Sequence, residues 1–314
     1  MAGAGKLGEF GLIADVLAPL ADNPTAQNLQ DDAAVYAPPV GHDLVISTDA
    51  FVAGVHFPLN ASPGLVARRA VACNLSDLAA KGAKPVGCLL SLGVDADWDN
   101  AFLRDFADAF GTALGLADMA LWGGDTVSTP TGFVSLTVHG LVPSGQMLTR
   151  RGAQDGDDVY VTGTIGDGWL DLKDNGPAYA NPQPPVAFGP LLPGLAHAAL
   201  DISDGLMADL DHICRASGGR MDIDGGRIPL SARGQDYMAQ GGALAQLVTG
   251  GDDLQIAFTA PPSAAESLID AARQAHTPIT PIGRFTQCKT EKCAVLRDEK
   301  GAEISLDRRG YSHF

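Results

Sequence analysis

The sequence predicts a protein of mixed α/β type, in which helices and strands alternate along most of the chain. Stretches whose apolar residues recur every three or four positions, as on one face of a helix, alternate with short apolar or every-second-residue stretches typical of strands. The chain has 314 residues, the length of roughly two domains. We therefore expect helices and strands in two domains, although one large domain would also fit this length.

Composition and charge restrict the function. The chain is 46% apolar and 18% charged, with a mean hydropathy of +0.07, which excludes disordered, collagen-like and fibrous proteins. Its net charge of −16 argues against binding nucleic acid or an anionic membrane. The apolar runs are shorter than the ~20 residues that span a bilayer, and residues 1–8 lack the apolar block of a signal peptide. We expect a cytoplasmic protein.

The five cysteines fit this compartment. Their odd number argues against a disulfide framework. Cys73, Cys88 and Cys214 lie in apolar stretches, where a reduced thiol packs as a small hydrophobic group. A zinc site would need further Cys or His ligands spaced around Cys288 and Cys293, and we expect none.

The first half of the chain predicts three helices and three strands. Helical spacing covers 10–20, 65–80 and 102–113, and strand patterns cover 44–46, 119–122 and 134–138. Polar residues are expected just past the first two strands, at Ser47-Thr48-Asp49 and at Gly123-Gly124-Asp125. The helix at 65–80 and the residue after it place Asn74, Asp77 and Lys81 on the face opposite the apolar stripe.

The second half begins after a polar, turn-rich stretch at 141–158, which predicts a domain boundary. Strand patterns follow at 159–162, 200–203, 255–259 and 279–283, and the proline-rich stretch at 175–193 predicts an irregular excursion. One helix is expected at 206–217, with Asp204 as its cap. Another is expected after Ser263, where Glu266 completes the pattern of a capping box.

Aspartates recur in these turns and at strand ends. Any one alone is a common turn or capping residue, but several that converged would repel each other by up to ~4 kcal/mol per pair at ~4 Å. A cation would be needed to hold them together, and oxygen-only ligands favour Mg²⁺ over Zn²⁺. The aspartates concerned are Asp31, Asp32, Asp49, Asp125, Asp201, Asp204, Asp252 and Asp253, with Asp77 on a helix.

Magnesium would also let a chain of this negative charge hold a polyphosphate, because metal ions bridge carboxylate and phosphate oxygens. Phosphoryl transfer is therefore the leading chemistry. The sequence contains no P-loop pattern, and the glycine-rich stretch at 163–168 lacks the P-loop lysine. The protein-kinase motifs and the G-x-S-x-G nucleophile elbow are also missing from the sequence.

Ordered motifs along nearly the whole chain resemble those of the thiamine-monophosphate kinase family. This family belongs to the superfamily of phosphoribosyl-aminoimidazole synthetase, whose members share an ATP site built without a P-loop. The motifs are Gly8-Glu9-Phe10, Asp31-Asp32-Ala33-Ala34, Ser47-Thr48-Asp49, Val52-Ala53-Gly54-Val55-His56-Phe57, Asn74-Leu75-Ser76-Asp77-Leu78-Ala79-Ala80, Gly123-Gly124-Asp125-Thr126, Leu148-Thr149-Arg150, Val161-Thr162-Gly163-Thr164, Asp201-Ile202-Ser203-Asp204-Gly205-Leu206 and Gly310-Tyr311-Ser312-His313-Phe314.

The resemblance implies ATP-dependent phosphorylation of thiamine monophosphate to thiamine diphosphate, by direct in-line transfer without a phosphoenzyme. It also implies an aminoimidazole-ribonucleotide-synthetase-like fold of two domains. Residues 1–145 would form an N-terminal domain with a mixed sheet and helices, which binds ATP and metal and forms a homodimer. Residues 146–314 would form a C-terminal α/β domain that completes the active site.

The resemblance further assigns roles to individual residues. Catalytic roles fall to Asp125, Arg150 and Asp204. An arginine fork matches phosphate oxygens, and a tyrosine can stack on an aromatic ring. The implied ATP contacts are Gly124, Asp125, Arg150 and Ser203; the implied contacts of thiamine monophosphate are His56, Asp252 and Tyr311; the implied ligands of several Mg²⁺ ions are Asp32, Ser47, Thr48, Asp49, Asp77, Asp125, Asp201 and Asp204.

The chain departs from the family pattern in three places, one of which is Gln30, which precedes Asp31 where the family usually has glycine. The family stretch Gly-Gly-Glu-Asp-Tyr-Glu-Leu corresponds here to 250–256, with Asp252 for the first acid and Leu254 for the tyrosine, and the arginines of a proline-rich stretch are absent at 181–185. Two alternatives stay open: a sister ATP-dependent enzyme of the superfamily with another small substrate, and a homologue that binds ATP and metal without turnover. Relatives in hydrogenase maturation and selenophosphate synthesis use a cysteine near one terminus, whereas this chain ends in His313-Phe314 and has no cysteine before Cys73.

Overall fold

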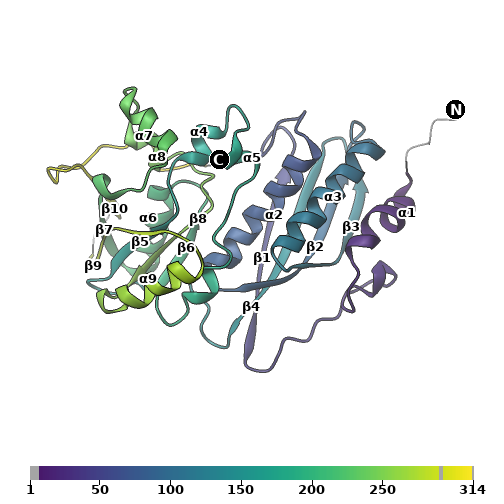
Figure 1. The fold of residues 1–314 in the computed structure, drawn as a ribbon, viewed down its shortest axis with the longest axis horizontal. Helices are drawn as coiled ribbons and strands as arrows, with labels where there is room; N and C mark the ends of the chain where they lie inside the picture. Colours follow the sequence, from purple (N-terminus) through teal and green to yellow (C-terminus); the bar gives the residue numbers. More distant parts are fainter. Residues whose placement is uncertain (1–6, 290–292, 313–314) are drawn as a thin grey trace. The chain divides into compact units, whose positions relative to one another are not determined.

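The computed structural model describes residues 7–289 and 293–312 (Figure 1). Its contacts divide the chain into two compact units. Unit 1 comprises the chain up to Leu75 together with Pro85–Leu141, and unit 2 comprises Ser76–Lys84 together with the chain from Val142 onward. Each unit has its own sheet and helices, so the predicted mixed α/β class is confirmed. The expected His313 and Phe314 motif end lies outside the described residues.

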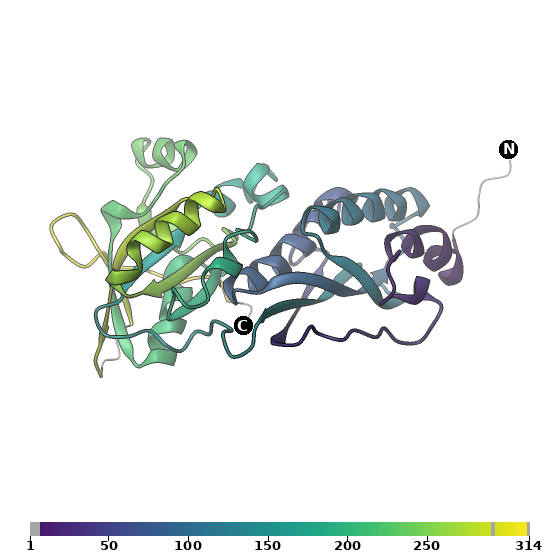
Figure 2. The same ribbon diagram turned by 60° about the horizontal axis from the view of Figure 1, so that its bottom comes forward.

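Unit 1 is built on a four-stranded sheet with the order β1-β4-β2-β3. Helices α2 and α3 cover one face of this sheet (Figures 1 and 2), and we call the other the open face. The strands are β1 (His42–Val52), β2 (Lys84–Val94), β3 (Ala120–Ser128) and β4 (Phe133–Pro143), and the helices are α2 (Pro63–Ala80) and α3 (Asn100–Leu116). Every second residue of β4 from Val134 to Val142 is buried, as the alternation in the sequence predicts.

Helix α3 shows why these residues form a helix. Asp99 caps its first turn by accepting a hydrogen bond from the backbone N–H of Phe102 at 2.9 Å. Phe106 and Phe110, one turn apart, are almost fully buried and stack on each other with ring centroids 5.7 Å apart. The apolar stripe predicted from the sequence is therefore the face that packs into the core.

A bulge in β3 shapes the open face. Cys88 of β2 pairs with Leu121 and Leu89 pairs with Gly123, so Trp122 is an extra residue on β3. The Trp122 indole lies over Gly87, where a Cβ atom would overlap the ring. The bulge thus redirects one large aromatic side chain, and β2 accommodates it with a glycine.

The amino-terminal helix is present but irregular. It consists of α1 (Glu9–Leu12), a π-helical turn η1 (Ile13–Leu17) and a 3₁₀ turn η2 (Ala18–Leu20), and a second 3₁₀ turn, η3 (Gln27–Leu29), follows. Leu12, Val16 and Leu17 are buried, whereas Phe10 is 81% exposed. The expectation that Phe10 belongs to the packed stripe is therefore wrong.

Unit 2 is built on a six-stranded sheet with a core on each face. Its order is β10-β7-β9-β5-β8-β6, and only the β10–β7 pair is parallel. Neighbouring residues of β5 face opposite cores, because Val159 packs in the cluster of α6 and Tyr160 in the cluster of α9. These elements are β5 (Asp158–Thr162), β6 (Ala198–Ile202), β7 (Gly219–Asp224), β8 (Gln255–Ala260), β9 (Ile279–Gln287), β10 (Ala294–Arg297), α6 (Leu206–Ser217) and α9 (Ala265–Gln274).

The predicted excursion at 175–193 is mostly irregular but contains two short helical turns, α5 and η4. The remaining short elements of unit 2 are α4 (Asp167–Asp171), α5 (Pro177–Ala180), η4 (Gly189–Leu191), η5 (Gly225–Arg227), α7 (Ala232–Ala239), α8 (Leu244–Val248) and η6 (Pro262–Ala264). No helix among the described residues is long and apolar enough to cross a membrane.

Five local expectations are corrected. The triplet Ser47-Thr48-Asp49 and the residue Asp125 lie inside β1 and β3 rather than beyond them, because both strands run several residues past their apolar segments. Asn74 is fully buried and donates to the Ala70 carbonyl at 2.8 Å, so it does not share an exposed face with Asp77. Two capping expectations also fail: α6 begins after Gly205 with no side-chain cap, and α9 follows η6 with no capping box at Ser263.

Candidate active site

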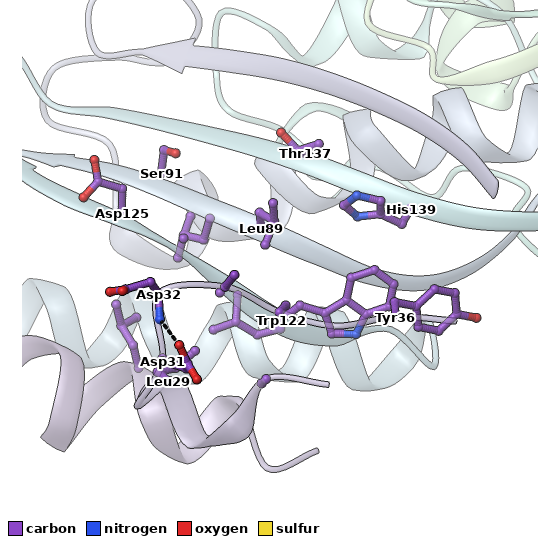
Figure 3. A pocket seen from close by; sticks show the side chains of 18 of the residues that line it. Leu29, Asp31, Asp32, Tyr36, Leu89, Ser91, Trp122, Asp125, Thr137 and His139 are labelled. Atoms are coloured by element: carbon purple, nitrogen blue, oxygen red, sulfur yellow. Dashed lines mark hydrogen bonds between the residues drawn. The ribbon is translucent and has the colours of Figure 1, made fainter. Parts of the chain in front are cut away.

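A pocket of about 760 Å³ opens on unit 1 and has two chemically different ends (Figure 3). Carboxylates of Asp32 and Asp125 lie at one end, and the rings of Tyr36, Trp122 and His139 lie at the other. The N-terminal segment, β2, β3 and β4 all contribute to its wall. Three predicted site residues, Asp32, Gly124 and Asp125, therefore line one pocket.

Local backbone structure positions the acidic end. The Asp125 carboxylate accepts a hydrogen bond from the N–H of Thr126 at 2.9 Å, and Asp31 accepts one from the N–H of Asp32 at 2.8 Å. At Gly124 the backbone of β3 passes so close to β2 that a Cβ atom would overlap the carbonyl oxygen of Leu90. A glycine is therefore required at this position, and it leaves the backbone beside Asp125 open to a ligand.

Stacked rings form the other end of the pocket. The Trp122 ring lies 4.6 Å from the Tyr36 ring at 25°, and 4.9 Å from the His139 ring at 33°. Burial lowers the pKa of His139, while a hydrogen bond to the backbone of Gly87 raises it. The His139 Nδ1 atom is buried without a hydrogen-bond partner in the described structure. The sequence analysis did not identify these rings, because they come from three separate segments.

The triplet on β1 is divided between the two faces of the sheet. Thr48 Oγ1 donates to the Leu136 carbonyl at 3.0 Å and lies 3.1 Å from Oγ1 of Thr137, which lines the pocket. Because side chains alternate along a strand, Ser47 and Asp49 point to the opposite face. The side chains of Ser47, Thr48 and Asp49 therefore do not all point to one face of the sheet.

His56 lies in the turn after β1. Its Nδ1 accepts a hydrogen bond from the N–H of Val52 at 3.1 Å, and its ring meets the edge of Phe51 at a centroid distance of 5.8 Å. This hydrogen bond places the proton of the neutral ring on Nε2. His56 is therefore oriented as an Nε2–H donor, and it is not among the residues that line the pocket.

Backbone hydrogen bonds gather four predicted site residues in unit 2. The N–H of Asp252 donates to the Ser203 carbonyl at 2.8 Å, and the N–H of Tyr311 donates to the Asp204 carbonyl at 2.9 Å. Asp252 has a φ of +63° and Leu254 a φ of +50°, a left-handed backbone that costs non-glycine residues free energy and occurs often at functional sites. The Tyr311 side chain is half exposed.

Two buried carboxylates hold this backbone in place. The Asp209 carboxylate accepts hydrogen bonds from the N–H groups of Asp204 and Gly205 at 3.2 and 3.1 Å. Burial, reinforced by the charges of Asp201 and Asp204, raises the pKa of Asp209 to about 8. The sequence analysis missed Asp209, although its position in the first turn of α6 was the available signal.

The second buried carboxylate, Asp253, holds the backbone of the segment at 166–168. Its two carboxylate oxygens each accept from the N–H of Gly166 at 2.9 Å, and one also accepts from the N–H of Gly168 at 3.2 Å. Burial raises the pKa of Asp253 to about 7, although both glycine hydrogen bonds oppose the rise. The Asp253 carboxylate is thus bound to backbone N–H groups of the segment at 166–168.

A second group of charges in unit 2 surrounds Lys81. Its Nζ donates to the Ala199 carbonyl at 3.1 Å. Burial lowers the pKa of Lys81, the charges of Asp201 and Asp77 raise it, and Arg150 lowers it further. The charges of three predicted site residues, Asp77, Arg150 and Asp201, thus act on a lysine to which the sequence analysis gave no role.

The predicted metal ligands are distributed over both units. Asp32, Ser47, Thr48, Asp49 and Asp125 belong to unit 1, and Asp77, Asp201 and Asp204 belong to unit 2. Within residues 7–289 and 293–312, no three His, Cys, Asp or Glu side chains lie close enough together to hold a metal ion. The donors are carboxylate and hydroxyl oxygens, a set whose chemistry fits Mg²⁺.

Comparison with known proteins identifies the family. Residues 30–142 match the family described as AIR synthase related protein, N-terminal domain. A thiamine-monophosphate kinase from Caulobacter vibrioides is 40% identical over 97% of this chain and 90% of its own length, and one from Escherichia coli K12 is 37% identical over 98% of each chain. The chain belongs to the thiamine-monophosphate kinase family.

Solved structures of thiamine-monophosphate kinases share its fold. The enzyme from Stenotrophomonas maltophilia K279a has a TM-score of 0.82 at 33% identity, over 95% of this chain and 98% of its own. The AaThiL complex with AMPPCP and TMP has a TM-score of 0.77 at 26% identity, over 98% and 97% of the two chains. The aminoimidazole-ribonucleotide-synthetase-like fold expected from the sequence is therefore confirmed.

One departure from the thiamine-monophosphate kinase pattern has a structural explanation. Leu254, where the family pattern has tyrosine, is only 1% exposed, and its N–H donates to the Ile202 carbonyl at 2.8 Å. A buried leucine suits this position because the side chain has no polar group to satisfy.

Proposed function

We propose that this chain transfers the γ-phosphoryl group of ATP directly to thiamine monophosphate and forms thiamine diphosphate. The observation that carries the proposal is the match along nearly the whole chain to thiamine-monophosphate kinases at up to 40% identity. The AaThiL complex with AMPPCP and TMP supports a nucleotide and thiamine monophosphate as the two ligands. Asp32, Gly124 and Asp125 in one pocket support nucleotide binding in unit 1.

Metal binding is part of the proposal. Mg²⁺ ions would be held by the predicted oxygen donors, principally Asp32 and Asp125 in unit 1 and Asp204 in unit 2. When bound, the metal neutralises charge on the phosphate oxygens. Arg150 is exposed, and its planar fork suits two oxygens of one phosphate. Ser203 would add a hydroxyl donor to the nucleotide.

No general base is needed for the transfer. The second pKa of a phosphate monoester is about 6, so the acceptor phosphate is largely deprotonated at neutral pH and already nucleophilic. The protein therefore contributes chiefly by positioning the two phosphates and by stabilising charge. Asp125, Arg150 and Asp204 are the residues to which we assign these catalytic roles.

Three residues are proposed to bind thiamine monophosphate. His56 presents Nε2–H, which can donate to a phosphate oxygen. Asp252 can face the cationic thiazolium ring, and Tyr311 can stack on an aromatic ring of the substrate. The left-handed backbone at Asp252 supports its role, because such strain is retained where position matters more than stability.

We also propose a cytoplasmic homodimer, in which residues 1–145 bind ATP and metal and form the dimer contact, and residues 146–314 complete the active site. The open face of the unit 1 sheet supports this contact. Thr48 and Thr137 meet on that face, and Ile46, two residues before Thr48, lies on the same face and is 59% exposed.

The first test is turnover by the purified full-length protein with ATP, Mg²⁺ and thiamine monophosphate, free thiamine or no acceptor. Chromatography identifies the thiamine product. Thiamine diphosphate formed only from the monophosphate is the expected result. ATP consumption without a thiamine product would indicate a sister substrate, and ATP binding without any turnover would indicate a non-catalytic homologue.

The same assay tests the metal assignment. We expect Asp125→Asn to lower the rate of thiamine diphosphate formation by about 100-fold or more, because it removes charge at the position that holds metal and phosphate. Asp105→Asn is the matched control, since Asp105 is exposed on α3 in the same unit, and its rate should equal that of the wild type. An Asp125→Asn rate at the wild-type level would show that the metal assignment is wrong.

A further inference from the structure

Lys81 lies among carboxylates of unit 2 that the proposed function assigns to metal binding. It follows the last residue of α2, and Asp77 precedes it by four residues, the spacing at which two side chains share one helix face. The Lys81 Nζ donates to the carbonyl oxygen of Ala199 at 3.1 Å. Ala199 is two residues from Asp201 on β6, so Lys81 is tied to the strand that carries this second carboxylate.

The position of β6 explains this contact. β6 is the last strand of the unit 2 sheet, and only one of its edges pairs with a strand, β8. On the other edge, the N–H of Ala199 donates to the Thr149 carbonyl at 3.0 Å, and the carbonyl of Ala199 accepts from Lys81. Arg150 follows Thr149 in the chain, so its backbone lies next to the segment that contacts Ala199, and its charge acts on Lys81.

Charges of both signs act on Lys81. Asp77 and Asp201 contribute two negative charges, and Lys81 and Arg150 contribute two positive charges. Both carboxylates favour the charged form of Lys81, which its burial disfavours. Without Lys81, the carboxylates of Asp77 and Asp201 would require bound cations. The chain therefore already supplies one cation at these carboxylates.

We propose that the Lys81 ammonium is a fixed cation of the active site, which takes the place of one divalent metal ion at Asp77 and Asp201. The inference rests on the proposed function, because that function assigns metal binding to these carboxylates. A lysine is suited to the role, since its ammonium is a compact point charge with three N–H donors. The hydrogen bond to Ala199 uses one donor and holds the charge in position.

The test must separate this role from a purely structural one, in which Lys81 only ties α2 to β6. Lys81→Gln removes the charge but keeps an N–H₂ group that can donate to Ala199, and Lys81→Arg keeps the charge. Lys81→Met removes both and serves if the glutamine variant does not fold. Lys173→Gln is the matched control, because Lys173 is exposed in the same unit. Circular dichroism establishes that each variant is folded.

The primary measurement is Mn²⁺ binding to the full-length protein without nucleotide, followed by the electron paramagnetic resonance signal of free Mn²⁺. We expect Lys81→Gln to bind one more Mn²⁺ per chain, or to bind Mn²⁺ at least about tenfold more tightly, since two carboxylates lose their fixed counter-charge. Lys81→Arg and Lys173→Gln should bind Mn²⁺ as the wild type does. Unchanged Mn²⁺ binding by folded Lys81→Gln would overturn the proposal.

Turnover gives a second measurement. The Mg²⁺ concentration for half-maximal thiamine diphosphate formation should fall about tenfold in Lys81→Gln. Weaker nucleotide binding together with unchanged Mn²⁺ binding would instead show that Lys81 binds a phosphate directly, which also overturns the proposal. If the wild type formed no thiamine diphosphate, the proposed function would fail, whereas the Mn²⁺ measurement would still decide the role of Lys81.

Discussion

At the scale of single residues, the aspartates at 204, 209, 252 and 253 of unit 2 fall into two kinds. Asp209 and Asp253 are buried and accept hydrogen bonds from backbone N–H groups. Asp204 and Asp252, in the segments that they hold, are proposed to bind ligands. The buried carboxylates thus act as positioning residues, because they fix the backbone from which the ligand-binding side chains project.

Asp253 makes folding stability depend on pH. Its pKa is raised from 3.8 to about 7 in the folded protein, so the folded state binds more protons than the unfolded state between these values. The contribution of Asp253 is therefore fully present below about pH 3.8 and is lost as the pH rises toward 7. We expect the free energy of unfolding of the wild type, relative to Asp253→Asn, to fall by about 1 kcal/mol per pH unit between pH 4.5 and 6.5.

Urea unfolding at several pH values measures this difference. Asp270→Asn is the control, because Asp270 is an exposed residue of α9 that pairs with Arg273, and surface pairs contribute little. Its difference from the wild type should not change over the same pH range. A difference for Asp253→Asn that is equally independent of pH would contradict the assignment of a raised pKa.

Sequence patterns identified the turn aspartates but could not separate the two kinds. Asp252 and Asp253 are adjacent and identical in type, and only the folded loop brings Gly166 and Gly168 to one of them. The sequence likewise predicted that Lys81 lies on the polar face of a helix, but not what it contacts. Its contact with Ala199 joins positions 118 residues apart, and no local pattern reports such a contact.

At the scale of elements, apolar patterns located the helices and strands but not their ends. The strand expected at 44–46 runs from His42 to Val52, and the one expected at 119–122 runs to Ser128. The polar residues that follow each apolar segment resemble a loop in sequence. The strands nevertheless continue through these residues, and Asp125 pairs with Ser91 of β2. Tertiary pairing overrides local preference here, and it moves candidate ligands from loops onto rigid strands.

The contrast between β3 and α3 yields an element-scale prediction. At Gly124 a new Cβ would overlap the Leu90 carbonyl of β2, whereas at Gly115 of α3 it would meet open space. We expect Gly124→Ala to lower the free energy of unfolding by about 3 kcal/mol or more, since backbone atoms must move apart. Gly115→Ala should raise it by about 0.5–1 kcal/mol, because alanine is the better helix former.

Urea denaturation of both variants measures these changes. The pair is informative because the substitution is the same and only the element differs. A Gly124→Ala protein as stable as the wild type would show that β2 and β3 do not approach as closely as described.

At the scale of the whole molecule, the resemblance to a family predicted more of the fold than the spacing of apolar residues did. Helical and alternating patterns indicated which segments are helices and strands, but the strand orders β1-β4-β2-β3 and β10-β7-β9-β5-β8-β6 depend on pairings between distant segments. The ordered motifs implied the fold because a family shares its topology. The Trp122 bulge and the rings around it belong to this chain's own packing, and the motifs did not reveal them.

The proposed homodimer gives a prediction at this scale. Sedimentation velocity of the wild type should give twice the chain mass of 32.4 kDa. Ile46→Glu places a charge on the open face of the unit 1 sheet and should yield the single-chain mass, since an unpaired charge is costly in an interface. Leu116→Glu, at the end of α3 and 87% exposed, should leave the mass doubled. A wild-type mass of one chain would contradict the dimer.

The placement of the tryptophans gives each unit its own optical signal. Trp122 forms part of the unit 1 pocket, and Trp169 packs against Gly250 in unit 2, two residues before Asp252. Trp98 stacks on Phe102 with ring centroids 4.6 Å apart and is not among the pocket residues. A ligand that enters the pocket alters the surroundings of the Trp122 indole, and one that contacts Asp252 alters those of Trp169. Tryptophan emission therefore responds to ligands at either candidate binding region, without any added fluorophore.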